Sequence, residues 1–151
     1  MTKSNHPGYF AVGIYHPKRE VNVGSLWRTA SILGAAFLFT VGRRYSPENS
    51  DTSKTWLTVP VFNFPDVSAL WSAIPLACPL VGVELAESAT LIENFQHPDR
   101  AIYLLGAEDY GLPPAVISKC HHLVKLRGNV SMNVAVAGGI VMYDRVSKVR
   151  G

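Results

Sequence analysis

Three short segments of the 151-residue sequence combine polar side chains with glycine in patterns that could bind or act on a ligand. The first is Asn22-Val-Gly-Ser-Leu-Trp-Arg28, in which Gly24 and Arg28 are four residues apart and would share one face of a helix. A glycine beside an arginine lets a ligand reach the backbone and the guanidinium together, and arginine binds phosphate through two hydrogen bonds. The spacing alone, however, favours an ordinary solvated helix arginine.

The second segment is Gly106-Ala-Glu-Asp-Tyr-Gly111, which follows the apolar run AIYLL. Its two glycines let backbone amides approach a ligand closely. Glu108 could accept hydrogen bonds from a hydroxyl or from nearby amides, or attract a cation. The segment matches neither the dinucleotide nor the phosphate-loop fingerprint. A tight turn between a strand and a helix explains the same residues equally well.

The third segment runs from Leu126 to Asn133 and leads into the apolar stretch 134–143. Ser131 or Asn133 could cap the following helix by accepting hydrogen bonds from its free amides, and capping alone would explain both residues. That helix is apolar nearly all round, so we expect it to be buried. Close packing of this helix is predicted by its small residues, Ala135, Ala137, Gly138 and Gly139.

The elements that must position these segments alternate along the chain. The apolar patterns predict strands at 10–15, 35–42, 57–62, 80–85, 101–105 and 122–126, and helices at 22–34, 65–74, 89–95, 113–119 and 132–148. Asn22 is the predicted N-cap of the first helix, and Gly34 its end. Alternation of this kind predicts an α/β fold with a mostly parallel sheet and helices on both faces. In such a sheet, ligands bind beyond the carboxyl ends of the strands.

Composition limits the class of protein. The chain carries 14 basic and 11 acidic residues, 17% charged and 48% hydrophobic residues, which excludes a disordered chain and a histone-like polycation. So little charge on a small domain predicts that a second subunit covers part of the surface. Cys78 and Cys120 lie in no metal-ligand spacing and indicate reduced thiols in a cytoplasmic protein. The apolar stretches are shorter than a membrane span requires.

Charge is unevenly distributed along the sequence. Residues 1–54 sum to +4, residues 55–118 to −6 and residues 119–151 to +5. If the fold brings the two basic ends together, the molecule has a positive face that suits a polyanion. Chance in a short chain is the alternative explanation.

Taken together and in this order, the three segments resemble the motifs of the SpoU/TrmH family of RNA methyltransferases in the SPOUT superfamily. The matching residues are Asn22-x-Gly-x-x-x-Arg28, Leu105 to Leu112 and Ser131-Met-Asn-Val-Ala-Val-Ala137. The resemblance runs from about Phe10 to Arg145. It implies a C-terminal trefoil knot, a rare exception among folds. It also implies a homodimer that transfers a methyl group from S-adenosylmethionine to a ribose 2′-hydroxyl of tRNA or rRNA.

The resemblance also assigns roles to individual residues. It implies catalytic roles for Arg28, Asn22, Glu108, Ser131 and Asn133, and no metal. It implies that S-adenosylmethionine is bound by Val83, Gly106, Gly111, Leu126, Ser131 and Met132. Arginine stays protonated in proteins. We therefore expect Arg28 to hold a substrate phosphate and stabilise the developing oxyanion.

Substrate recognition is expected to come from the domain itself, because residues 1–151 form one predicted domain with no appended RNA-binding segment. Candidates for phosphate contacts are Lys18, Arg19, Arg43, Arg44 and Lys54, although solvated loops would carry the same residues. The absence of an extension favours tRNA slightly over rRNA. Two other functions stay open: an RNA-binding module of the same fold without turnover, and a generic nucleotide-binding α/β enzyme.

Overall fold

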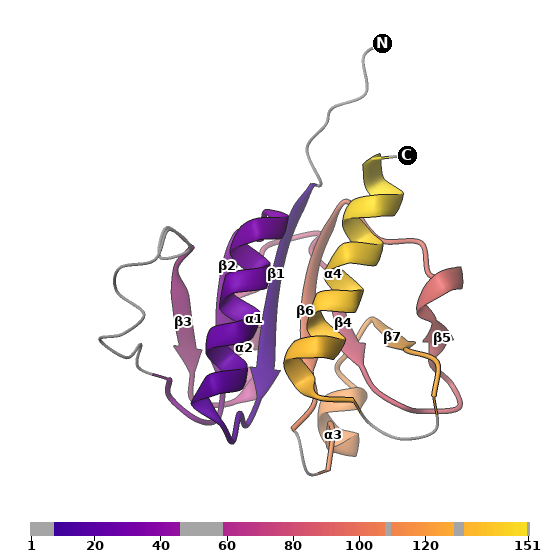
Figure 1. Ribbon diagram of the computed structural model, residues 1–151. Helices are drawn as coiled ribbons and strands as arrows, with labels where there is room; N and C mark the ends of the chain where they lie inside the picture. Colours follow the sequence, from indigo (N-terminus) through magenta and orange to yellow (C-terminus); the bar gives the residue numbers. More distant parts are fainter. Residues whose placement is uncertain (1–7, 46–58, 108–109, 129–131, 151) are drawn as a thin grey trace.

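One parallel sheet organises the part of the chain that the structure, a computed structural model, describes: residues 8–45, 59–107, 110–128 and 132–150. Its strands are β1 (Tyr9–Tyr15), β2 (Phe37–Val41), β3 (Val61–Phe64), β4 (Leu80–Val83), β5 (Thr90–Leu91), β6 (Arg100–Leu105) and β7 (His122–Lys125). They are arranged in the order β3-β2-β1-β6-β4-β7-β5, and each neighbouring pair is parallel. The carboxyl ends of the strands therefore meet at one edge, the lower edge in Figure 1.

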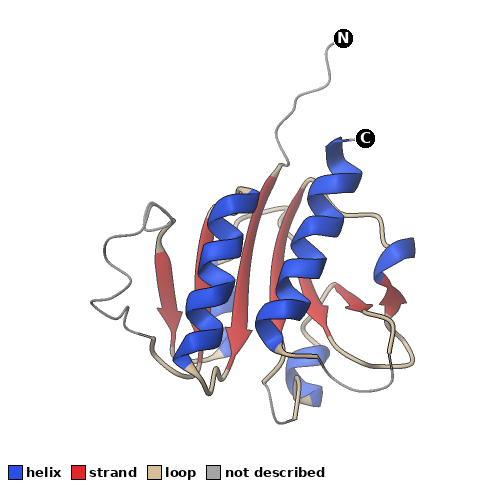
Figure 2. Cartoon of the chain, in the orientation of Figure 1, coloured by secondary structure: helices blue, strands red, loops and turns tan. Residues whose placement is uncertain are grey.

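Helices cover both faces of this sheet, as the alternation of elements predicts. They are α1 (Glu20–Leu33), α2 (Val67–Ala73), α3 (Pro114–Ile117) and α4 (Val134–Arg150), together with the 3-10 turn η3 (Ile92–Asn94). Helices α1 and α4 lie side by side on one face, and α2 and α3 lie on the other (Figures 1 and 2). The predicted α/β architecture with a mostly parallel sheet is confirmed.

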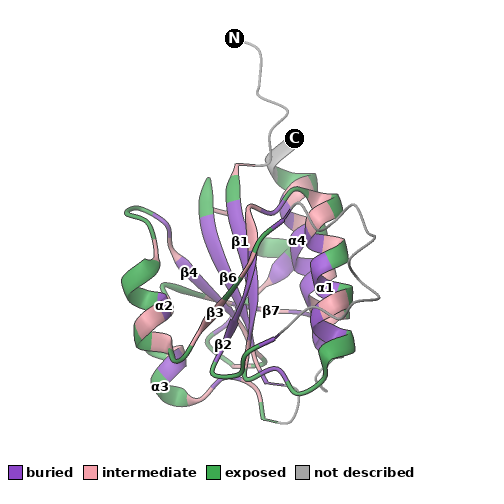
Figure 3. Ribbon diagram, turned by 90° about the vertical axis from the view of Figure 1, so that its left-hand side faces the viewer, coloured by how far each residue is buried: buried purple, intermediate pink, exposed green. Residues whose placement is uncertain are grey.

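The core lies on both faces of the central strands. Residues 101–105 of β6 are buried, and alternate side chains enter opposite clusters: Tyr103 packs with α1 and α4, whereas Leu104 packs with α2 and α3. A strand that is covered on both faces has no solvated side, which is why these strands read as continuous apolar runs rather than as alternating ones. Figure 3 shows the buried strands between half-exposed helices.

Helix α1 begins earlier than predicted. Its N-cap residue is Arg19, in an extended conformation, and Asn22 lies inside the first turn with only 7% of its surface exposed. The prediction of Asn22 as the N-cap is therefore wrong; its side chain serves a tertiary contact instead. The predicted end is confirmed, because Gly34 adopts a left-handed conformation (φ 89°) and its N–H donates to the Ala30 carbonyl.

Two further expectations are corrected. The segment predicted as a helix at 89–95 forms the short strand β5 and the single turn η3. Helix α4 is not buried all round, because Val136 is 54% exposed and Tyr143 is 65% exposed. The helix packs on the sheet and on α1 with one side only, so its opposite side is left uncovered within one chain.

The connection from β7 to α4 includes residues 129–131, which lie outside the described residues, so the trefoil knot stays a prediction. No helix in the described ranges is long and apolar enough to cross a membrane. Within the same ranges, no three His, Cys, Asp or Glu side chains are grouped so that they could hold a metal ion.

Candidate functional site

A cavity that is partly open to solvent lies where β4, β6 and β7 end. We call it the strand-end cavity. Val83, Leu105 and Lys125, the last residues of these three strands, line it, and α4 contributes Val134 and Ala137. The cavity also brings together all the predicted cofactor-binding residues that the structure describes: Val83, Gly106, Gly111, Leu126 and Met132. Ser131 lies outside the described residues.

The turn between Gly106 and Leu112 forms one wall of the cavity. Ala107 and Gly111 exchange two backbone hydrogen bonds, of 3.1 and 2.9 Å, which close the turn tightly. A Cβ atom at Gly106 would lie 2.7 Å from the backbone of Gly111. Gly111 itself has a φ of +68°. Both positions therefore require glycine. Glu108, the predicted carboxylate of this turn, lies outside the described residues.

Glu84 is a member of the cavity wall that our sequence analysis missed. It directly follows β4, and its carboxylate accepts hydrogen bonds from the backbone N–H groups of Leu112 (2.6 Å) and Leu85 (3.1 Å). A Cβ atom at Gly111 would clash with this carboxylate, since it would lie 2.3 Å from Oε2. The available signal was an acidic residue placed directly after the buried run Leu80–Val83.

A side-chain hydrogen bond joins the first and third sequence segments. Asn133 Nδ2 donates to Asn22 Oδ1 at 3.1 Å, which connects the start of α4 to the first turn of α1. Asn133 Oδ1 also accepts from the backbone N–H groups of Ala135 (2.9 Å) and Val136 (3.2 Å). Asn133 therefore caps α4, as one of the alternatives predicted, and also fixes α4 against α1.

Arg28 is exposed on α1 and is not among the residues that line the strand-end cavity. Packing does not require glycine at position 24, one turn before Arg28. A Cβ atom there would lie 3.7 Å from Tyr45 Oη, which is an ordinary contact distance. The structure therefore does not bring Arg28 to the cavity within one chain, although it brings Asn22 and Asn133 together.

The basic residues proposed to contact RNA lie at the carboxyl edge of the sheet. Lys18, Arg19, Arg43 and Arg44 are exposed and follow β1 and β2. Arg43 Nη1 donates to the backbone carbonyls of Lys18 (2.8 Å) and Pro17 (3.3 Å), so this arginine also ties two loops together. Lys54 lies outside the described residues.

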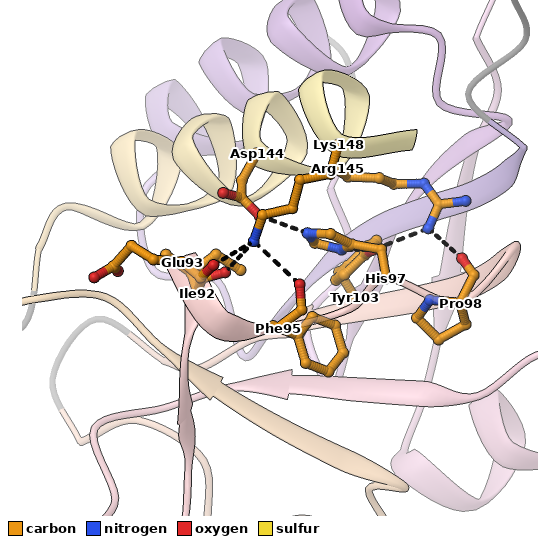
Figure 4. A network of polar contacts seen from close by, with 9 residues as sticks. All are labelled: Ile92, Glu93, Phe95, His97, Pro98, Tyr103, Asp144, Arg145 and Lys148. Atoms are coloured by element: carbon orange, nitrogen blue, oxygen red, sulfur yellow. Dashed lines mark hydrogen bonds and ion pairs between the residues drawn. The ribbon is translucent and has the colours of Figure 1, made fainter. Parts of the chain in front are cut away.

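Not all the basic residues of the C-terminal segment contribute to a positive face. Arg145 is fully buried, and its guanidinium donates to the carbonyls of Pro98 (2.6 Å) and Asp99 (2.8 Å) and to the hydroxyl of Tyr103 (3.1 Å). The expectation that the two basic ends share one face therefore fails for Arg145. The charge of Arg145 lies inside the fold, among backbone carbonyls and ring side chains (Figure 4).

The same polar network continues through His97. Its side chain is fully buried and contacts Tyr103 Oη at 2.6 Å and Asp144 Oδ2 at 2.7 Å, and Lys148 also pairs with Asp144 at 2.9 Å. Burial lowers the pKa of His97, although Asp144 opposes that shift. Burial also raises the pKa of Tyr103 to about 12. These groups attach the second half of α4 to the segment between η3 and β6.

Comparison with known proteins agrees with this geometry. A sequence model of the SpoU rRNA Methylase family matches residues 9–143. The chain is 37% identical over 68 residues to the 23S rRNA (guanosine-2′-O-)-methyltransferase RlmB of Acinetobacter baylyi, covering 43% of this chain and 27% of that protein. It is 26% identical over 135 residues to the mouse tRNA (guanosine(18)-2′-O)-methyltransferase TARBP1, covering 83% of this chain and 8% of that protein. The chain thus spans less than a third of these curated relatives.

Solved structures show the same fold. The TrmH/SpoU tRNA modifying enzyme of A. aeolicus superimposes with a TM-score of 0.83 at 18% identity, covering 95% of this chain and 77% of that one. The SpoU methyltransferase AviRb of Streptomyces viridochromogenes, in complex with the cofactor AdoMet, gives a TM-score of 0.81 at 24% identity, covering 93% and 57%. Because the family match extends over nearly all of the described sheet and into α4, this chain belongs to the SpoU rRNA methylase family.

Proposed function

We propose that this chain is an S-adenosylmethionine-dependent RNA methyltransferase that modifies a ribose 2′-hydroxyl. The observation that carries the proposal is the strand-end cavity, which gathers five of the six residues that the resemblance assigns to the cofactor. Family membership supports the same activity, because both curated relatives are named as RNA 2′-O-methyltransferases.

The residues of the cavity fit S-adenosylmethionine. Val83, Leu105, Leu126 and Val134 provide apolar surface of the kind that packs on an adenine ring. Gly106 and Gly111 keep the turn compact and carry no side chains themselves, so that backbone groups at these two positions can face the ligand. When bound, the cofactor supplies an electrophilic methyl group. The chain itself supplies binding and orientation, and positioning alone can lower such a barrier substantially.

We assign Arg28 to the RNA rather than to the cofactor. It is exposed on α1 and lies outside the cavity lining. A guanidinium stays protonated, so it suits a phosphate or a developing oxyanion better than proton removal. Asn22 and Asn133 hold α1 against the start of α4 and thereby fix Arg28 relative to the cavity. The roles of Glu108 and Ser131 remain those that the resemblance implies.

We propose that RNA is recognised at the exposed basic residues of the carboxyl edge, Lys18, Arg19, Arg43 and Arg44, and by Lys54. Phosphate contacts make binding salt-dependent, with a slope that falls by about 1 for each contact that is lost. Arg44→Gln should therefore weaken binding of tRNA and reduce its salt slope, whereas Lys119→Gln on the other face of the sheet should change neither. Equal effects of the two variants would contradict the assignment. The preference for tRNA over rRNA stays a prediction.

We further propose that the chain forms a homodimer through the groove between α1 and α4. This α1–α4 groove is lined by Asn22, Asn133 and the exposed apolar residues Ile32, Val136, Ile140 and Tyr143. A second copy seated there would cover apolar side chains and lie beside the Asn22–Asn133 contact. Ile140→Lys should give a monomer by light scattering. Leu76 is 92% exposed and lies outside the groove, so Leu76→Lys should leave the dimer intact. A wild-type monomer would overturn the proposal.

The function is tested by incubating the protein with labelled S-adenosylmethionine and unmodified tRNA or rRNA, followed by digestion to nucleosides. We expect the label on a ribose-methylated nucleoside. Binding of cofactor and RNA without transfer would favour the alternative of an RNA-binding module of the same fold. Label on a base would contradict the assignment to the 2′-hydroxyl. The cytoplasmic location stays a prediction from the cysteines.

A further inference from the structure

We propose that Glu84 is a cofactor-binding residue, whose carboxylate accepts hydrogen bonds from the two ribose hydroxyls of the bound nucleoside. The inference rests on the proposed function, because it takes S-adenosylmethionine as the ligand of the strand-end cavity. The predicted cofactor-binding residues in this cavity offer mainly backbone and apolar groups. Glu84 adds a charged side chain that can recognise the ribose.

The position of Glu84 is fixed on three sides. Its backbone N–H donates to the Val124 carbonyl at 3.0 Å, which holds the end of β4 against β7. Its carboxylate accepts from Leu112 N–H at 2.6 Å and from Leu85 N–H at 3.1 Å. Gly111 packs directly on the same carboxylate. A group held in this way keeps its orientation without a ligand, as a binding residue should.

The acceptor capacity of the carboxylate exceeds what the protein uses. Two carboxylate oxygens offer about four lone-pair sites. The protein donors occupy one site on each oxygen: Leu85 at Oε1 and Leu112 at Oε2. No further donor to this carboxylate is found among the residues that the structure describes, so one site on each oxygen is left, and Glu84 lines the cavity. Two neighbouring acceptor sites match the two neighbouring hydroxyls of a ribose.

The charge of Glu84 is not offset by a cation within the part of the chain that the structure describes. Lys125 and Arg127 line the same cavity, but the partner of Arg127 is Glu93 and no ion pair joins Glu84 to either residue. Hydrogen bonds to a charged acceptor are stronger than those to a neutral one. A ligand that brings two hydroxyl donors should therefore be preferred over one that lacks a donor.

Two other roles for Glu84 would produce different results. If Glu84 only holds the turn at Gly111 and Leu112 in place, its removal would weaken every nucleoside ligand by the same factor. If it faces the sulfonium of the cofactor, its removal would weaken S-adenosylmethionine more than the uncharged thioether S-adenosylhomocysteine. Only contact with the ribose makes the effect depend on the hydroxyls.

The test is calorimetric titration with S-adenosylhomocysteine and its 2′-deoxy and 3′-deoxy analogues, which needs no methyl transfer. We expect the wild type to bind each deoxy analogue about 10-fold or more weakly, the range of one hydrogen bond to a charged group. Glu84→Ala should bind all three ligands with similar affinity, and Glu84→Gln should lose part of the preference. Glu87→Ala, an exposed glutamate three residues later, should keep the wild-type preference.

A preference for the hydroxyls that persists in Glu84→Ala would overturn the proposal. So would a wild type that binds the deoxy analogues as tightly as S-adenosylhomocysteine, and this comparison remains available if Glu84→Ala does not fold. Failure of the wild type to bind S-adenosylhomocysteine at all would instead overturn the proposed function, and the ribose assignment with it.

Discussion

The two ends of α4 hold the chain together by different means. At its start, Val134 and Ala137 line the strand-end cavity, and Asn133 is an exposed cap that also binds Asn22. At its other end, Arg145 is fully buried and Lys148 donates to three backbone carbonyls of the η3 segment. The start of α4 therefore borders a cavity and acceptor groups that face it. At the other end of α4, the polar side chains bind to other segments of the same chain.

Helix α4 has 17 residues, and it can line a ligand site at one end while its other end is held in place. Such a helix is about 25 Å long, so its far end lies well away from the cavity. A buried charge needs hydrogen-bond partners, and here the Arg145 guanidinium donates to two backbone carbonyls while His97 contacts Asp144. We infer that the anchored end fixes the helix, so that the open end presents a preformed wall to the cofactor.

Among changes to the two ends of α4, we expect Arg145→Met, at the anchored end, to have the largest effect. The substitution removes the hydrogen bonds that the buried guanidinium donates to the carbonyls of Pro98 and Asp99 and to the hydroxyl of Tyr103. We expect the free energy of unfolding in urea to fall by about 3–5 kcal/mol, because several hydrogen bonds from a charged donor are lost at once and each contributes about 1.5–3 kcal/mol. Arg44→Met, on the surface, should change it by about 0.5 kcal/mol or less. A loss below about 1 kcal/mol for Arg145→Met would contradict the anchoring role.

The next largest effect concerns turnover rather than stability. Arg28→Ala should lower the rate of methyl transfer by about 10²–10³-fold, the loss measured when one oxyanion-stabilising donor is removed. Its exposed position predicts an unchanged urea midpoint. Arg28→Lys should restore part of the rate, because it keeps the charge but not the two-pronged geometry. Near-full turnover by Arg28→Ala would remove arginine from the mechanism.

The smallest effect is a pH dependence of the anchored end. Burial lowers the pKa of His97 in the folded chain, so the unfolded chain takes up its proton first as the pH falls. Stability from this group is therefore fully present above about pH 6.5, the ordinary histidine value, and is lost progressively below it. Urea unfolding between pH 7 and pH 5 should show this decline, and His97→Gln should flatten it. An equally steep decline in His97→Gln would assign it to other groups.

Much of the cavity could be predicted because it depends on local patterns. Buried parallel strands read as apolar runs, and the carboxyl ends of such strands meet at one edge, so Val83, Gly106 and Leu126 could be assigned to one site from the sequence and the resemblance. Gly34 could be placed at a helix end for a similar reason, since left-handed helix ends favour glycine.

The remainder depends on contacts between distant residues. Asn22 looks like a helix cap in sequence, but its partner Asn133 lies 111 positions away. No local pattern in the sequence marks His97 and Arg145 as buried, and only the packing of α4 on the sheet buries their side chains. The exposed side of α4 was missed because an apolar helix pattern does not distinguish a buried helix from one that carries an uncovered apolar face.

The central claim is that the strand-end cavity binds the cofactor, and its most direct test is a plugged cavity. Ala137 lines the cavity from α4, so Ala137→Leu should fill part of it. Calorimetric titration with S-adenosylhomocysteine should give one site per wild-type chain, at least 10-fold weaker binding for Ala137→Leu and unchanged binding for Ala73→Leu, an exposed position on α2. Wild-type affinity in a folded Ala137→Leu protein would contradict the claim.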